Sequence, residues 1–364
     1  MIFLIPYTLL LLIGILSIGK PTKAVRFWSC AAMFVVLTLI MGLRKIDYAG
    51  EDTIVYARDF ERIVSNNLSF IDILTREFEK DYLFYLIARV FSYISPDVNL
   101  WILACAAFYV YAFSWLIYKY SKNIFLSYMI FMTWDFYLYN FQLMRHCFSL
   151  AFVILSLKFV IERNWKKFIV FYLGAATSQI VSVVSGITYF FKNISRRNLG
   201  ILGFIFFLFF FFIISLPRET LISLIFSSSL IDNDRFDQFK TRGGDAVTNA
   251  VICIAFIAVS IFFVLRNKKK YRLYPEYQNI PLFLMMSFFG LVFYSMMFLV
   301  AEMYRVAQYF SFVTVIMVPL AMSLEKTKSV KLIVILLISA FCLKHFWGGF
   351  LTSTDYYPYK FFWE

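Results

Sequence analysis

Long apolar segments separated by short polar ones recur from the first residue of the chain to the last. A helix needs about 20 such residues to span the hydrocarbon core of a bilayer. A helix also satisfies its own backbone hydrogen bonds in lipid, and the alternating pattern of a β-barrel is absent from the sequence. The pattern therefore predicts spanning helices at residues 2–18, 27–43, 100–118, 124–141, 147–161, 199–215, 247–265, 280–300, 306–323 and 332–346.

Two further apolar segments do not fit an ordinary span. Residues 82–94 are too short to cross a bilayer comfortably, which predicts a re-entrant or interfacial helix, with a short tilted span as the alternative. Residues 168–191 have basic clusters at both ends and are interrupted near Thr177, Ser178 and Gln179. If both basic clusters lie on one side of the membrane, this segment is a broken, re-entrant helical hairpin.

The composition supports the membrane interpretation. Of the 364 residues, 62% are hydrophobic and 16% are charged, whereas about a quarter of the residues of a soluble domain are charged. We therefore predict an all-α polytopic integral membrane protein with about 10 to 12 transmembrane helices. We expect residues 1–364 to form a single membrane domain. Residues 2–18 lack a basic n-region and a small-residue cleavage site, so they predict a retained first span rather than a cleaved signal peptide.

The net charge of +13 comes mainly from short basic clusters between the apolar segments. The positive-inside rule places such clusters in the cytoplasm, and this explains the charge without nucleic acid as a partner. Both termini, and the polar loops at residues 44–81 and 217–245, then face the periplasm. These features predict a multi-pass protein of the bacterial inner membrane. The clusters are residues 20–26, 119–122, 163–167, 192–197, 266–272 and 326–331.

Acidic residues gather in the first polar loop. Asp52 lies near its start, before an amphipathic helix predicted around residues 58–60, and Glu79 lies near its end. If the loop folds back on itself the two carboxylates converge, and either one could then act as a general base. The alternative is that these acids only solvate the loop or pair with Arg44 and Lys45.

Two arginines lie where the positive-inside rule does not explain them. Arg145 and Arg305 each sit in a short connection between apolar segments on the non-basic side. The planar guanidinium donates paired hydrogen bonds and keeps its charge, which suits a lipid diphosphate. The alternative is that each arginine snorkels or pairs with a local acid such as Glu302.

Metal and cofactor chemistry is not indicated. The five cysteines lie in or beside apolar segments without the spacing of a metal site, and the two histidines, His146 and His345, are too few for a ligand cluster or a hydrolase triad. We therefore predict no metal site and no cofactor, although Glu51 and Asp52 leave a metal requirement open. Residues 232–245 mix acidic, basic and aromatic groups, as a sugar-binding loop or any solvated loop would.

Several short elements recur in an order that is characteristic of one family. Gly42-Leu43-Arg44 is followed by a Gly-acid-Thr-x-x-Tyr element at residues 50–56, with Asp52 at the acidic position and Tyr56 at its end. Residues 79–82 approximate Glu-x-Gly-Tyr. This order resembles the Wzy and EpsG-like group of polysaccharide polymerases, and the likeness covers most of the chain.

The later elements depart from the group's pattern at two positions. Arg145 matches the arginine of an Arg-Gln element, but His146 replaces the glutamine. Residues 175–179 resemble Ala-x-x-x-His, but Gln179 replaces the histidine. The final elements are Arg-x-x-x-Tyr-Phe, matched by Arg305, Tyr309 and Phe310, and a Pro-Tyr pair at residues 358–359.

The resemblance implies a polymerase that joins O-antigen repeat units carried on undecaprenyl diphosphate at the periplasmic face. In this interpretation Asp52 or Glu79 takes the proton of the acceptor hydroxyl. The diphosphate is bound by Arg145 and Arg305, with Arg44 as a further candidate, while Tyr56, Tyr82 and Tyr309 contact sugar or lipid. Membrane lipid is a further partner, and the interpretation leaves room for a chain-length regulator protein.

Two other functions remain open from the sequence. A flippase for lipid-linked oligosaccharides would also be polytopic and basic, but it would place the arginines in a central cavity. An O-antigen ligase would share the chemistry, but it would carry a large periplasmic loop containing histidine.

Overall fold

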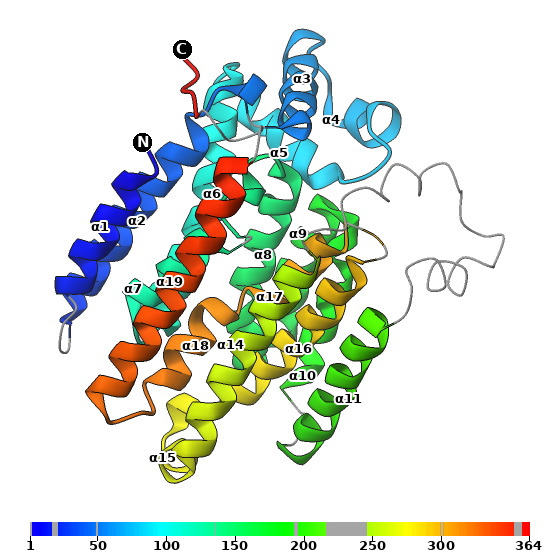
Figure 1. The fold of residues 1–364 in the computed structure, drawn as a ribbon. Helices are drawn as coiled ribbons and strands as arrows, with labels where there is room; N and C mark the ends of the chain where they lie inside the picture. Colours follow the sequence, from blue (N-terminus) through cyan, green and yellow to red (C-terminus); the bar gives the residue numbers. More distant parts are fainter. Residues whose placement is uncertain are drawn as a thin grey trace. The chain divides into compact units, whose positions relative to one another are not determined.

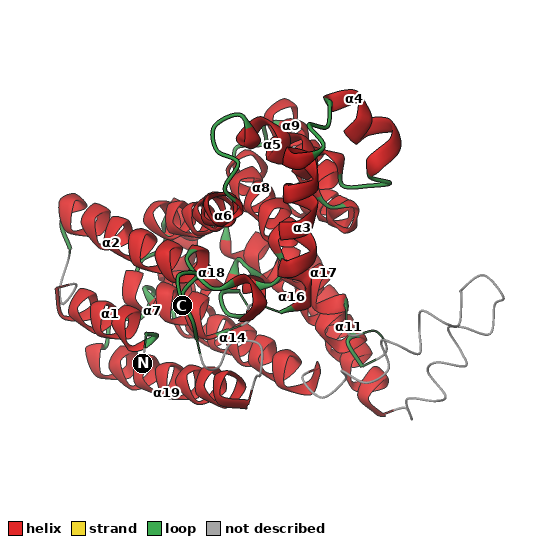
Figure 2. Ribbon diagram, turned by 90° about the horizontal axis from the view of Figure 1, so that it is seen from above, coloured by secondary structure: helices red, strands yellow, loops and turns green. Residues whose placement is uncertain are grey.

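The computed structural model describes residues 2–16, 21–48, 50–134, 136–192, 196–215, 246–298, 300, 302–352 and 359–364. In these ranges the chain is almost entirely helical and contains no named strand, as Figures 1 and 2 show. The predicted all-α fold is confirmed. The predicted polar loop at residues 217–245 and the Pro358 of the last sequence element lie outside the described residues.

The described residues include seven helical segments that are long and apolar enough to cross a membrane, and five shorter apolar ones. The chain is therefore a multi-pass membrane protein. The long segments are α2 (Lys23–Gly42), α6 (Val98–Tyr120), α8 (Met144–Ile161), α14 (Ala246–Arg266), α16 (Ile280–Met296), α17 with α18 (Met303–Ser311 and Thr314–Met322) and α19 (Lys328–Thr352). The shorter ones lie in α1 (Leu4–Leu16), α5 (Tyr82–Ser92), α7 (Ile124–Thr133), α11 (Arg196–Ser215) and a segment that ends with α10 (Thr188–Phe191).

The helices form two compact units. The first comprises Met1–Val183 and Thr327–Glu364, and the second comprises Val184–Lys326. In the first unit α2 packs on α6, and α6 packs on α8. Helix α7 contacts both α1 and α19, which lie beside it in Figure 2. In the second unit α16 contacts α11, α14 and α17. The single domain expected from the sequence stays a prediction.

Two of the predicted spans are interrupted. The span predicted at residues 124–141 ends as a helix at Thr133, and a short 3-10 helix (Tyr139–Phe141) follows later. Polar side chains satisfy one of the backbone groups in this interruption, since Tyr109 and Asn140 both donate to the carbonyl oxygen of Phe136. The span predicted at residues 306–323 likewise divides into α17 and α18.

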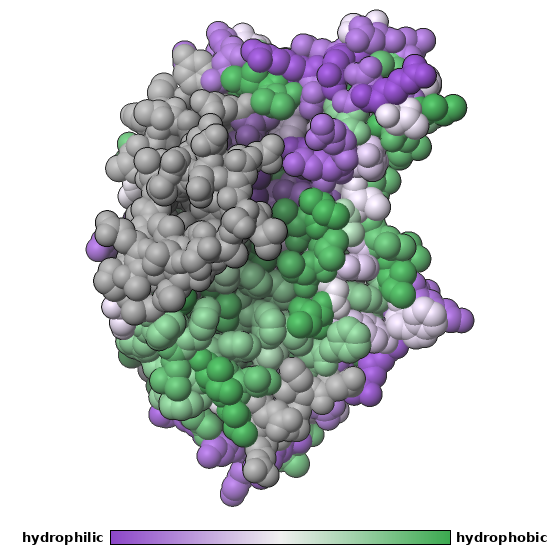
Figure 3. Space-filling view, turned by 90° about the vertical axis from the view of Figure 1, so that its right-hand side faces the viewer, coloured by the Kyte–Doolittle hydropathy of each residue, from purple (hydrophilic) through white to green (hydrophobic). Residues whose placement is uncertain are grey.

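The segment between α2 and α6 forms a layer that has a hydrophobic core and a polar exposed surface, and we name it the polar layer. It contains α3 (Glu51–Ser65), the short α4 (Phe70–Asp72) and α5. Helix α3 is amphipathic, as predicted, because Tyr56, Phe60 and Ile63 are buried on one face while the other face carries charged residues. Figure 3 shows hydrophilic residues gathered at the end that carries α3 and α4.

One glycine fixes the start of α3. Gly50 has a φ of +82°, a region that side chains with a Cβ rarely adopt. A Cβ at this position would also collide with the side chain of Gln142. The chain therefore enters α3 tightly against the segment that leads into α8.

The segment predicted as a broken hairpin is interrupted at Gln179. Helix α9 (Trp165–Ser178) ends there, Gln179 is extended (φ −157°, ψ 117°), and a 3-10 helix (Ile180–Ile187) begins. The hydroxyl of Tyr172 donates to the carbonyl oxygen of Val183 at 3.3 Å. In a continuous helix these two residues would lie about 16 Å apart along the axis. The chain therefore reverses direction after α9, as predicted.

Candidate functional site

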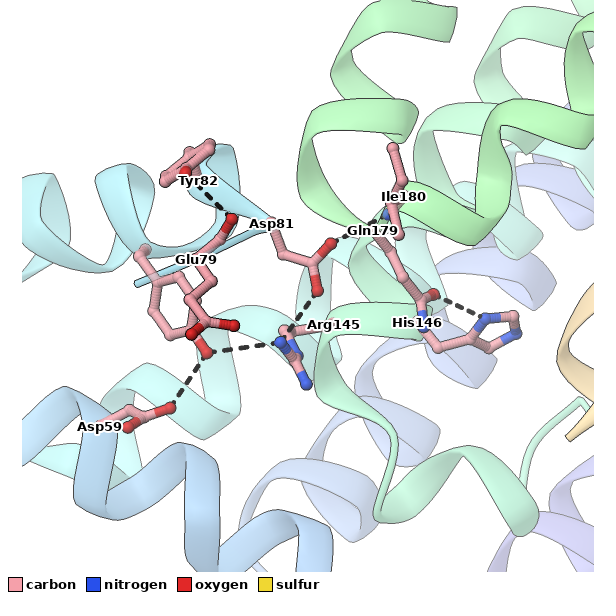
Figure 4. A network of polar contacts seen from close by, with 9 residues as sticks. Asp59, Glu79, Asp81, Tyr82, Arg145, His146, Gln179 and Ile180 are labelled. Carbon is pink, nitrogen blue, oxygen red and sulfur yellow. Dashed lines mark hydrogen bonds and ion pairs between the residues drawn. The ribbon is translucent and has the colours of Figure 1, made fainter. Parts of the chain in front are cut away.

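An ion pair lies beside the helix break in the first unit (Figure 4). Nη1 of Arg145 is 2.9 Å from Oδ2 of Asp81. Arg145 occupies the first turn of α8, and Asp81 immediately precedes α5. The Asp81 side chain is 4% exposed, whereas that of Arg145 is 23% exposed. The carboxylate is thus buried, and part of the Arg145 side chain remains accessible to solvent.

The backbone of Asp81 aims its carboxylate at two elements at once. Its φ of +61° lies in the left-handed region, which aspartate tolerates better than most residues. The family pattern has glycine at this position, a residue that adopts the same region freely. The second oxygen of Asp81 accepts a hydrogen bond from the backbone N–H of Ile180 at 2.9 Å. Asp81 therefore ties the start of α8 to the hairpin break.

A second carboxylate joins the group through a tyrosine. The hydroxyl of Tyr85 donates to Oδ2 of Asp59 at 3.0 Å, and Nη1 of Arg145 lies 3.5 Å from the same hydroxyl. The Arg145 guanidinium also lies over the ring of Tyr56, 5.0 Å from its centroid. These five residues, Asp59, Asp81, Tyr56, Tyr85 and Arg145, are called the Arg145 network below.

The environment of Asp59 suits proton transfer. Burial raises the pKa of Asp59 above its ordinary value, while the Tyr85 hydrogen bond and the charges of Arg62 and Arg145 oppose that rise. The Asp59 side chain is 20% exposed, and Arg62 lies 3.7 Å from its carboxylate. A carboxylate whose pKa is raised accepts a proton more readily, which is what general-base catalysis requires.

The two departures from the family pattern contact each other. Nδ1 of the buried His146 donates to Oε1 of Gln179 at 3.1 Å (Figure 4). The pattern has glutamine at residue 146 and histidine at residue 179, so the two residue types are exchanged between the partners of one contact. This contact joins α8 to the hairpin break next to the Asp81 bond.

Arg44 lies in a different environment from that of Arg145. It is 3% exposed, and its guanidinium donates to the backbone carbonyl oxygens of Met41 and Phe141. Its backbone also forms an antiparallel bridge with Phe361 near the C-terminus. In this arrangement Arg44 joins the end of α2 to the segment before α8 and faces the protein interior. A role in diphosphate binding stays a prediction.

The predicted convergence of the Asp52 and Glu79 carboxylates stays a prediction. Asp52 lies in the first turn of α3, and no hydrogen bond or ion pair joins it to Glu79 among the described residues. Glu79 is exposed, and its carbonyl oxygen accepts a hydrogen bond from Tyr82. In Figure 4 its side chain extends toward the side on which Arg145 and Asp59 lie.

Arg305 and Tyr309 belong to α17 in the second unit. Nε of Arg305 is 2.8 Å from Oε2 of Glu302, so the local pairing considered from the sequence is present. The Arg305 side chain is 24% exposed, and Tyr309 is fully buried. Among the described residues no cluster of His, Cys, Asp and Glu that could hold a metal ion is found.

Sequence reasoning missed three members of the Arg145 network: Asp59, Asp81 and Tyr85. One signal was available, since Asp59 follows Tyr56 by three residues and therefore shares its face of α3. No comparable signal identifies Asp81, because its partners lie 64 and 99 residues away in the sequence.

Comparison with known proteins identifies a family. A family model described as the EpsG family matches residues 27–361, which include the whole Arg145 network. This confirms the resemblance that the order of the motifs predicted. No curated protein and no solved structure matches the chain.

Proposed function

Because this chain belongs to the EpsG family, we propose that it is a membrane polysaccharide polymerase that acts at the periplasmic face of the bacterial inner membrane. Its donor is a growing glycan on undecaprenyl diphosphate, such as an O-antigen, and its acceptor is an incoming lipid-linked repeat unit. The reaction is a glycosyl transfer that needs no cofactor.

The observation that carries this proposal is the position of Arg145. Its side chain is 23% exposed, it sits in the first turn of α8, and Asp81 and Tyr56 hold its guanidinium in place. The first turn of a helix presents unpaired N–H groups and a partial positive charge, so both features favour a phosphate ligand. A diphosphate bound here would contact Arg145, and the negative charge of the diphosphate would face the N-terminus of α8.

The proposed reaction forms one bond and breaks one bond. The acceptor hydroxyl oxygen attacks the anomeric carbon of the donor glycan, and the bond from that carbon to the lipid diphosphate breaks. The diphosphate leaves with both bonding electrons, and Arg145 stabilises the charge that develops on it. The hydroxyl proton passes to a carboxylate of the protein.

Asp59 is the carboxylate best suited to accept this proton. It shares the Tyr85 hydroxyl with Arg145, and burial raises its pKa. Asp52 and Glu79 remain candidates for the same role and belong in the same assay. Tyr56 packs under Arg145, and it would also limit the space open to the sugar.

Arg305, in the second unit, would bind phosphate groups of a lipid-linked substrate on its own account. Its ion pair with Glu302 leaves its side chain 24% exposed. Tyr309 is buried one turn further along α17, so its contribution would be to hold that helix in place.

The test is the size distribution of the surface polysaccharide in a strain that lacks this gene. The strain is complemented with wild type, Arg145→Gln or Arg305→Gln, at matched amounts of protein in the membrane. A matched control is Arg76→Gln, because Arg76 is exposed in the polar layer and outside the Arg145 network. We expect the deletion strain to carry single repeat units, and only wild type and the control to restore long chains.

The other functional classes give different results in this experiment. Loss of all surface polysaccharide in the deletion strain would indicate a flippase or a ligase. An unchanged size distribution would contradict the proposal outright.

A further inference from the structure

A cavity lies against the face of α3 that is opposite the Arg145 network. Its volume is about 370 Å³, which falls within the range of about 300–1,000 Å³ that small-ligand sites occupy. Four charged side chains, one amide and one aromatic ring contribute to its lining: Lys45, Asp47, Arg58, Glu61, Asn99 and Phe362.

The periodicity of α3 separates the cavity from the network. Ile54, Arg58 and Glu61 follow one another at intervals of four and three residues, so they share one face of the helix. Tyr56 and Asp59 lie on the other face, where Asp59 bonds Tyr85 and Tyr56 packs on Arg145. One helix therefore serves two sites, and a ligand in the cavity would not touch the network.

The C-terminal segment supplies the aromatic ring. Its backbone pairs with the end of α2, since the N–H of Phe362 donates to Leu43 at 3.0 Å and the N–H of Lys45 donates to Lys360 at 2.9 Å. This pairing fixes Phe362 at the cavity, where it is 40% exposed. An exposed ring held in this way offers a flat apolar surface beside hydrogen-bonding groups.

Most of the charged side chains that line the cavity can still bind a ligand. Lys45 and Arg58 are positive, and Asp47 and Glu61 are negative, so the four sum to zero. Arg58, Asp47 and Glu61 form no side-chain hydrogen bond or ion pair with any described residue. Guanidinium groups donate, carboxylates accept, and an amide does both, which together match the hydroxyl and ring oxygens of a sugar. A site without net charge does not favour a diphosphate.

We propose that this cavity binds a neutral saccharide segment of the glycan that the chain elongates, away from the reacting bond. The identity of this ligand rests on the proposed function. A glycan held on one side of α3 would keep its growing end near the network on the other side. Losing this hold would then shorten the chains that are made before release.

The test measures binding without turnover. The full-length protein in nanodiscs is titrated with lipid-free oligosaccharides of one to three repeat units, released from the surface polysaccharide of the source strain. We expect Arg58→Gln with Glu61→Gln to weaken binding by about tenfold or more, because each substitution removes a charged hydrogen-bonding partner. Both residues are exposed, so the thermal unfolding midpoint should not change.

Controls separate a saccharide site from other sites. Arg76→Gln, which removes an exposed charge elsewhere in the polar layer, should bind as wild type does. Inorganic pyrophosphate should not displace the oligosaccharide. The inference is overturned if wild type does not bind, if the double variant binds like wild type, or if pyrophosphate competes.

The two proposals can fail separately. Binding of a free oligosaccharide requires no polymerisation, so an inactive polymerase would leave this result intact. Conversely, a chain that polymerises normally but binds no free oligosaccharide would contradict only the saccharide cavity.

Discussion

Arg145 joins separate parts of the first unit through one guanidinium. It pairs with Asp81 before α5 and packs on Tyr56 of α3. Removing one member of a buried ion pair leaves the other charge uncompensated, at a cost of about 3–5 kcal/mol. Single substitutions at Arg145 or Asp81 therefore mix a structural effect with any effect on ligand binding.

The role of Asp59 can be tested by a nearly isosteric change. Asp59→Asn keeps the size of the side chain but removes its ability to take a proton. We expect the rate of polymerisation to fall roughly 10²- to 10⁴-fold, measured with lipid-linked repeat units and purified protein. Asp97→Asn is the control, because Asp97 caps α6 and asparagine caps a helix equally well. A full rate in Asp59→Asn would exclude it as the base and leave Asp52 and Glu79.

The pH dependence should follow the hydrogen bond from Tyr85. This bond stabilises the Asp59 carboxylate and so lowers a pKa that burial has raised. A base must be deprotonated, so activity is lost as the pH falls through its pKa. In Tyr85→Phe the pKa of Asp59 rises further, and we expect the acid limb of the kcat/KM profile to move to higher pH. A limb that stays in place would argue against Asp59.

Single residues were only partly predictable from the sequence. Arg145 attracted attention in the sequence because it is an exception to the positive-inside rule, and in the structure it lies at the candidate site. Asp81 was not singled out, since its role depends on a left-handed backbone and on partners far along the chain. Arg44 matched a motif, yet its guanidinium is buried against backbone carbonyl groups, which no local pattern reveals.

At the scale of elements, the hairpin break is held by side chains from α8 and from the residue before α5. Gln179 contacts His146, and the next N–H is bound by Asp81. A broken helix leaves backbone groups without partners, so these contacts make the break possible within an apolar unit.

The exchanged pair gives a direct test of this contact. His146→Gln and Gln179→His each put two like residues face to face, and we expect each to reduce polymer yield. The double variant restores the arrangement of the family pattern and should recover most of that yield. Polymer analysis in the complemented deletion strain measures the coupling between the two sites. Additive losses in the double variant would show that the contact does not matter.

Element positions were predictable where a single physical rule decided them. The boundaries of α6, α14 and α19 lie within a few residues of the predicted spans or extend them, because apolar length sets a spanning helix. The interruptions after α7 and between α17 and α18 were not predicted. The first depends on Tyr109 and Asn140, whose bonds to the Phe136 carbonyl group appear only in the folded chain.

At the scale of the whole molecule, the charge distribution predicts the orientation in the membrane. All five native cysteines are buried, so labelling of introduced cysteines should have little background. In intact cells we expect a membrane-impermeant maleimide to label Arg76→Cys, in the polar layer, but not Lys268→Cys, in a basic cluster. Both positions are exposed. Labelling of Lys268→Cys without permeabilisation would invert the predicted orientation.

The sequence says less about the substrate than about the membrane or the family. Hydropathy identifies the membrane, and the order of the motifs identifies the family, because both are properties of the chain read locally. Sugar recognition depends on which polar groups converge. The α3 cavity combines residues as far apart as Lys45 and Phe362, so no local pattern could identify it.

The most direct test of the central claim is turnover by the purified protein when the Arg145–Asp81 pair is neutralised as a unit. Asp81→Asn with Arg145→Gln removes both charges, so no buried charge is left uncompensated and the fold should be retained. The substrate is an undecaprenyl diphosphate-linked repeat unit, and product length is measured on gels together with the thermal unfolding midpoint. We predict a wild-type midpoint and a loss of roughly 10²- to 10³-fold in rate. A folded double variant that polymerises at the wild-type rate would contradict the assignment of Arg145 to the diphosphate.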